Sequence, residues 1–106
     1  MPWTFSFHEA AAVEAAALPQ DVRTRLERIV GIVAEHGFDH LPPKLVRHLR
    51  GELWEFRLTG KDGIARALYV TRRGRRVVIV RVFAKKTQKT PPREIRLAIA
   101  RAREVE

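Results

Sequence analysis

The chain contains no cysteine, and this absence excludes a disulfide framework, a thiolate metal site and a cysteine nucleophile. No apolar run is long enough to span a bilayer, and the N-terminus lacks the basic start and the cleavage site of a signal peptide. We therefore expect a soluble protein of the cytoplasm that has no membrane partner. The length of 106 residues is that of one ordinary domain, so residues 1–106 should form a single domain.

Basic residues are abundant and unevenly placed. The formal net charge is +9. Residues 1–43 hold three arginines against six acidic residues, a net charge of −3, whereas residues 44–106 hold the other 18 basic residues against six acidic ones, a net charge of +12. Such a basic part favours a polyanion as partner, most simply nucleic acid.

The N-terminal part predicts a strand followed by a helical hairpin. Three aromatic residues alternate with polar ones over residues 3–7, as in a strand buried on one face. Residues 8–17 are rich in Ala and Glu, which favours a helix. Pro19 ends that helix and opens a second one, whose apolar residues recur on one face as far as Gly37.

The C-terminal part predicts three strands and a last helix. Strands are expected over residues 52–59, 64–71 and 76–83, and the short links between them imply an antiparallel meander. A helix should follow over residues 91–103. The sequence thus predicts an α+β fold in which an N-terminal strand and a helical hairpin pack on an antiparallel β-meander with a C-terminal helix.

Strand periodicity predicts the direction of the side chains. If Trp54, Phe56 and Leu58 face the helices, Glu55 and Arg57 project from the opposite face of the sheet. Several arginines on that face would make a binding platform, although any one of them could instead pair with a nearby carboxylate.

On the third strand, Val78, Val80 and Val82 are expected to share one row, and Arg81 is expected in the other row together with Phe83. The direction of the arginine on the second strand, Arg66, stays open, because its row also contains apolar residues.

A basic, polar segment connects the third strand to the last helix, with the sequence Phe83-Ala84-Lys85-Lys86-Thr87-Gln88-Lys89-Thr90-Pro91. Thr90 is expected as the N-cap of the helix and Pro91 as its first residue. A short connection of this composition suits a phosphate chain, because lysines supply charge while hydroxyl and amide groups supply directed hydrogen bonds. A solvated basic loop is an equally good interpretation of the composition alone.

Three motifs together resemble the RelE/HigB superfamily, and more narrowly its phage-derived, HigB-like branch of type II toxin–antitoxin toxins. They are the segment above and two strand motifs, Leu53-Trp54-Glu55-Phe56-Arg57 and Ala65-Arg66-Ala67-Leu68-Tyr69. The nine-residue segment is the specific one of the three. Ala65 departs from the pattern, because the family usually has an aromatic residue at this position.

The resemblance implies a toxin that cleaves messenger RNA in the ribosomal A site. The RNA 2′-hydroxyl would attack the adjacent phosphate and leave a cyclic phosphate and a free 5′-hydroxyl, with no metal or other cofactor required. The implied partners are the ribosome, messenger RNA and a cognate antitoxin with a helix-turn-helix and an acidic contact region.

Catalysis of this kind needs charge at the phosphate and groups that move protons. Arg57 is the first candidate for gripping the scissile phosphate, since a guanidinium donates two parallel hydrogen bonds to phosphate oxygens. Arg66 is the second candidate. Of the two adjacent lysines, Lys86 is expected to be catalytic and Lys85 to bind the RNA backbone. Tyr69, the only tyrosine, is a candidate for acid–base catalysis, although a half-buried place in the sheet fits it equally well.

Further RNA contacts are expected from the basic and polar residues of the third strand and the connection, namely Lys85, Arg81, Thr87, Gln88 and Lys89. Two other functions stay open: a gyrase-inhibiting toxin of the same fold, similar to ParE, and a non-catalytic RNA-binding or phage regulatory module.

Overall fold

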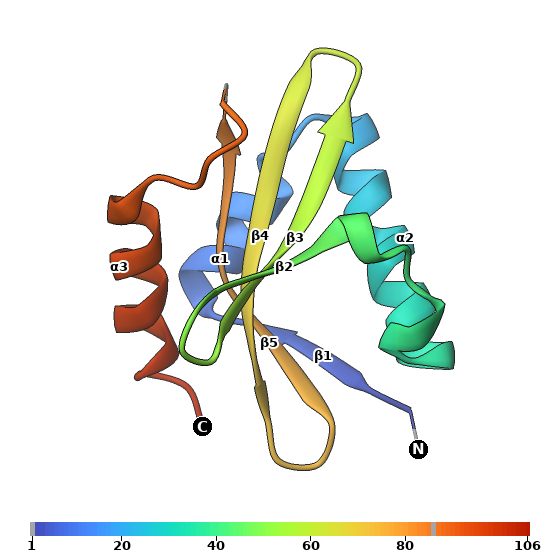
Figure 1. Cartoon of the computed structure of the whole chain (residues 1–106), viewed down its shortest axis with the longest axis vertical. Helices are drawn as coiled ribbons and strands as arrows, with labels where there is room; N and C mark the ends of the chain where they lie inside the picture. The colour runs from blue at the N-terminus through green and yellow to red at the C-terminus, as the bar shows by residue number, and fades with distance from the viewer. Residues whose placement is uncertain (1, 86) are drawn as a thin grey trace.

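The structure of the protein is a computed structural model that describes residues 2–85 and 87–106. Five strands and three α-helices follow one another along the chain, together with two short 3-10 turns (Figure 1). Their bounds are β1 (Thr4–Phe7), α1 (Glu9–Ala16), α2 (Gln20–His36), β2 (Val46–Arg50), β3 (Leu53–Gly60), β4 (Gly63–Arg72), β5 (Arg76–Lys85) and α3 (Pro92–Ala102). No helix of the described residues has the length and apolar character needed to cross a membrane.

The strands form one mixed sheet in the order β1-β5-β4-β3-β2. The strand β1 runs parallel to β5, and the other neighbours are antiparallel. The predicted α+β fold with its hairpin, meander and C-terminal helix is therefore confirmed. The edge strand β2 was not predicted, because its five residues follow the Pro42-Pro43 loop and carry two half-buried and three exposed side chains rather than a clear apolar row.

Helices cover both faces of the sheet, and each face has its own apolar cluster. The helices α1 and α2 pack with Phe56, Leu58 and Tyr69 on one side, which we call the hairpin face. On the other side, the α3 face, the helix α3 packs with Leu53 and Leu68. In Figure 1 the helix α3 stands on the side of the sheet away from α2.

A β-bulge in β5 overturns the prediction for its rows. Leu68 pairs with Arg81 while the next residue, Tyr69, pairs with Ile79, so Val80 is the extra residue. As a result Val80 lies in the α3-face cluster and Val82 in the hairpin-face cluster, although both were expected in one row.

Two further expectations about side chains were wrong. Phe7, expected to be buried, is 38% exposed; it is the last residue of the edge strand β1 and is not part of the hairpin-face cluster. The helix α3 begins at Pro92 with Pro91 as its N-cap. Thr90 is therefore not the cap, and its hydroxyl instead donates a hydrogen bond to Glu55.

Candidate active site

Three cationic side chains meet on the α3 face, beyond the part of the sheet that α3 covers. Arg57 and Arg66 stand directly opposite each other on β3 and β4, and Lys85 ends the neighbouring strand β5. We call Arg57, Arg66 and Lys85 the cation cluster. Arg66 belongs to the row that contains Leu68 of the α3-face cluster, which settles the direction that the sequence had left open.

The three side chains of the cation cluster donate hydrogen bonds to two oxygens of a single residue, Gln88. The side-chain oxygen Oε1 of Gln88 accepts hydrogen bonds from Arg57 at 3.1 Å and from Arg66 at 3.2 Å. Its carbonyl oxygen accepts from Lys85 at 2.8 Å and from Arg66 at 3.3 Å. Three cations thus converge on two neutral acceptors, which is the geometry that anionic oxygens would fill more favourably.

A buried carboxylate lies beneath the cluster. Glu55 and Arg66 are each only 1% exposed, and Oε2 of Glu55 lies 3.5 Å from Nε of Arg66 and 3.9 Å from Nε of Arg57. The hydroxyl of Thr90 donates to Oε1 of Glu55 at 2.5 Å. Glu55 therefore ties β3, β4 and the connection before α3 together and fixes the direction of Arg66. Oε2 of Glu55 and Nε of Arg66 have no hydrogen-bond partner among the described residues, so their contact is ionic.

A fourth cation comes from the strand that the sequence did not reveal. Arg47 on β2 pairs in register with Glu55 on β3, which places it on the α3 face beside the cluster. Its charge acts on both Arg66 and Lys85. Once β2 is recognised as a strand, the alternation of its side chains identifies Arg47 as a residue of the α3 face. Without β2, no signal in the sequence points to Arg47.

The ammonium of Lys85 is perturbed. Partial burial, together with the positive charges of Arg66, Arg57 and Arg47, lowers the pKa of Lys85 to about 8, against the opposing effect of Glu55. A lysine with this pKa can donate a proton near neutral pH far more readily than an ordinary lysine.

Two predicted site residues lie outside the cation cluster. Tyr69 belongs to the hairpin face, is 2% exposed and stacks on Phe56 with ring centroids 4.1 Å apart. Burial raises the pKa of its hydroxyl. Arg81 is held by two carboxylates, Glu14 at 2.5 Å and Glu94 at 2.7 Å. A hydrogen bond from each guanidinium nitrogen to these acids leaves Arg81 little capacity for an external anion.

The other candidates belong to the connection before α3. Thr87 and Lys89 are exposed, and the Thr87 hydroxyl donates to the Lys89 carbonyl at 3.4 Å. Within residues 2–85 and 87–106, neither side chain forms a hydrogen bond or an ion pair with the cation cluster. The prediction that Lys86 is catalytic lies outside the described residues.

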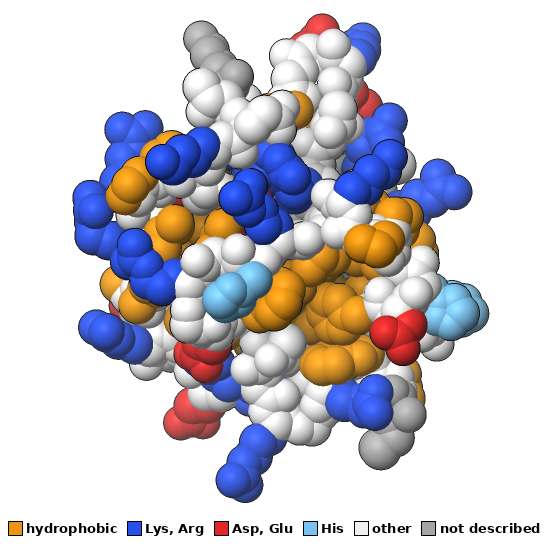
Figure 2. Space-filling view, viewed as in Figure 1, with side chains coloured by type: hydrophobic (Ala, Val, Ile, Leu, Met, Phe, Trp, Pro, Cys, Tyr) orange, Lys and Arg blue, Asp and Glu red, His pale blue; other side chains and the backbone are white. Residues whose placement is uncertain are grey.

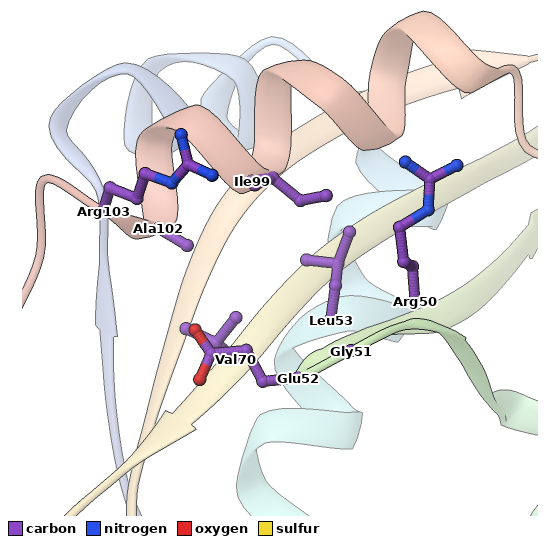
Figure 3. A pocket seen from close by; sticks show the side chains of 8 residues that line it. All are labelled: Arg50, Gly51, Glu52, Leu53, Val70, Ile99, Ala102 and Arg103. Atoms are coloured by element: carbon purple, nitrogen blue, oxygen red, sulfur yellow. The ribbon is translucent and has the colours of Figure 1, made fainter.

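Surface charge follows this arrangement. In Figure 2 the Lys and Arg side chains gather over α3 and the upper part of the sheet, whereas an apolar area lies toward α2. A hollow of about 250 Å³ lies between α3 and the β2–β3 turn. Figure 3 shows Arg50 and Arg103 on its two sides, with the apolar side chains of Leu53 and Ile99 between them. No residue of the cation cluster lines this hollow, so the chemistry is not placed there.

Solved structures show the same fold. A mutant of the E. coli toxin RelE in the free state is 21% identical, covers 95% of this chain and 98% of its own, and has a TM-score of 0.68. The archaeal RelE–RelB complex from Pyrococcus horikoshii OT3 is 18% identical, covers 79% of this chain and 96% of its own, and has a TM-score of 0.58. The RelBE2 toxin–antitoxin complex from Mycobacterium tuberculosis is 25% identical, covers 80% of this chain and 100% of its own, and has a TM-score of 0.50.

The fold and its motifs define a protein of the RelE-like toxin superfamily. Within it, the chain belongs to the Gp49-like family of phage-derived proteins (DUF891), whose model matches residues 14–103. No curated protein matches the sequence. The resemblance predicted from the three motifs is thereby confirmed at the level of the superfamily.

Proposed function

We propose that the protein is the toxin of a type II toxin–antitoxin system and a metal-independent endoribonuclease that cleaves messenger RNA on the ribosome. The observation that carries this proposal is the convergence of Arg57, Arg66 and Lys85 on the two oxygens of Gln88. In the proposed complex, two oxygens of the scissile phosphate replace the two oxygens of Gln88. The replacement is favourable because charge-assisted bonds to phosphate are stronger than bonds to neutral amide oxygens.

The reaction exchanges one ester bond of phosphorus for another. The 2′-hydroxyl of the RNA releases its proton to solvent as its oxygen forms a bond to phosphorus, the bond from phosphorus to the 5′-oxygen breaks, and a 2′,3′-cyclic phosphate and a 5′-hydroxyl result. Arg57 and Arg66 stabilise the additional negative charge at the phosphate in the transition state. Lys85, with its lowered pKa, supplies the proton that the departing 5′-oxygen requires.

An antitoxin is the proposed partner of this surface. It would cover the cation cluster with acidic side chains and bind DNA through a helix-turn-helix, and the complex would be tighter at low salt than at high salt. The cytoplasm is the proposed location, because the proposed antitoxin and the ribosomal substrate would be found there.

The test is induced expression of the wild type beside Arg57→Ala and a matched control, Arg28→Ala. Arg28 is an exposed arginine on α2, so both variants lose one positive charge, but only Arg57 contacts the proposed phosphate site. Growth would be followed and messenger RNA ends mapped by primer extension. We expect growth arrest and new ends at codon-spaced positions in the wild type and in Arg28→Ala, and neither in Arg57→Ala.

Two results would refute the proposal and lead to other functions. Growth arrest with intact messenger RNA would point to gyrase as the target. A folded protein that causes neither arrest nor cleavage would be an RNA-binding module without catalysis.

A further inference from the structure

A second basic surface lies at the turn between β4 and β5. We call Arg72-Arg73-Gly74-Arg75-Arg76 the arginine turn. Two of its arginines are engaged within the protein: Arg72 contacts Glu52 at 3.3 Å and the Ala102 carbonyl at 2.9 Å, and Arg76 donates to main-chain carbonyls. Arg73 and Arg75 are exposed, and neither forms an ion pair within residues 2–85 and 87–106.

The backbone of the turn is unfavourable for an arginine. Arg75 has a φ of 55°, and it is the only residue other than glycine with a positive φ in the described part of the chain. Glycine or asparagine is preferred at such a position. The guanidinium of Arg75 lies 5.7 Å from the centre of the Trp3 ring, a cation–π contact that leaves its N–H donors available for an anion. Such an outlier is a reason to look for a function of the side chain.

The arginine turn is remote from the cation cluster. Arg72 lies six positions after Arg66 along the extended strand β4, a distance of about 20 Å. In Figure 1 the β4–β5 turn forms one end of the molecule, and the connection from β5 to α3 lies toward the other end. The two surfaces therefore cannot bind the same phosphate, but one large RNA can contact both.

We propose that the arginine turn is a second RNA-binding surface, which grips the phosphate backbone of double-helical RNA through Arg73 and Arg75. Arginine is suited to this task because its planar fork donates two hydrogen bonds to one phosphate. A narrow hairpin tip fits the wide, shallow minor groove of an RNA helix, between the two phosphate rows. An acidic protein is a poorer match, because none of the large apolar residues that are exposed in the described chain lies in the turn and protein interfaces depend on such anchors.

The inference takes only its ligand, RNA, from the proposed function, and its test does not require cleavage. The wild type, Arg73→Ala/Arg75→Gly and the control Arg25→Ala/Arg28→Ala would be titrated against a fluorescent RNA duplex of about 16 base pairs. The control removes the same charge from exposed positions on α2. Glycine at position 75 suits the positive φ, so the variant should unfold at a temperature no lower than that of the wild type.

The expected result is a change in salt dependence. Each lost phosphate contact lowers the slope of log affinity against log salt by about 1, so the double variant should lose about 2 units and the control almost none. Between about 50 and 200 mM salt, the ratio of wild-type to variant affinity should shrink roughly 16-fold. An unchanged slope, or an equal loss in the control, would overturn the proposal. If RNA cleavage were absent but this slope changed as expected, the proposed function would fail and the second surface would stand.

Discussion

The buried pair of Glu55 and Arg66 leads to a prediction that separates stability from function. We consider the single change Glu55→Leu and the double change Glu55→Leu/Arg66→Met, which replaces both charges with apolar side chains of similar size. Both residues are 1% exposed, and Oε2 of Glu55 lies 3.5 Å from Nε of Arg66. In the single variant, the Arg66 guanidinium stays buried without its carboxylate.

The magnitude follows from the cost of a buried charge. Removing one partner of such a pair costs about 3–5 kcal/mol, whereas replacing both by apolar residues is often neutral or stabilising. Loss of the hydrogen bond that Thr90 donates to Glu55 adds about 1 kcal/mol in either variant. The single variant should therefore lose about 4–6 kcal/mol of the free energy of unfolding, and the double variant no more than about 2 kcal/mol.

Urea unfolding at equilibrium measures both variants, and the primer-extension assay measures cleavage. We expect the double variant to fold and to cleave no RNA, because Arg66 is lost from the proposed phosphate site. That result would mean that the ion pair is retained for catalysis. A double variant as unstable as the single one would contradict this reasoning, because the cost would then not come from the unpaired charge of Arg66.

Two further predictions concern the cation cluster. Cleavage should fall as the pH rises through about 8, because the pKa of Lys85 is lowered to about 8 and only its protonated form donates a proton. Lys85→Arg should shift or remove this fall. A pH–rate profile from about pH 6 to 9.5 measures it, and a profile with no descending limb would refute the role of Lys85. Gln88→Ala should bind a non-cleavable 2′-deoxy oligonucleotide more tightly than the wild type, because the phosphate then no longer has to displace Oε1 from Arg57 and Arg66. Gln88→Glu should bind it more weakly, because its carboxylate competes for the same two arginines. Fluorescence anisotropy measures both, and weaker binding by Gln88→Ala would show that the Gln88 side chain itself holds the RNA.

Within the cation cluster, the sequence predicted the direction of Arg57 but not that of Arg66. Strand alternation put Glu55 and Arg57 on the face opposite the helical hairpin, because Phe56 between them is an unambiguous core residue. The position of Arg66 on β4 needed the pairing with Arg57, since every described residue of its strand from Ala65 to Val70 is buried and alternation is then uninformative.

The sequence could not predict which side chains are held by partners that lie far away in the chain. Arg81 resembles a binding residue until Glu14, 67 residues earlier in the chain, is seen beside it. Thr90 has the sequence context of a helix cap, yet its hydroxyl donates a hydrogen bond to the carboxylate of Glu55 on β3. The bulge at Val80 has no signal in a run of valines and isoleucine, so periodicity fails beyond it.

The parallel pairing of β1 with β5 has a consequence for synthesis of the protein. The first strand of the chain finds its neighbour only when the last strand has been made, and the cation cluster draws its side chains from three strands of which β5 is the last. The N-terminal half emerging from a translating ribosome therefore contains neither a complete sheet nor the phosphate site. The proposed phosphate site can therefore form only after β5, the last of its three strands, has been synthesised.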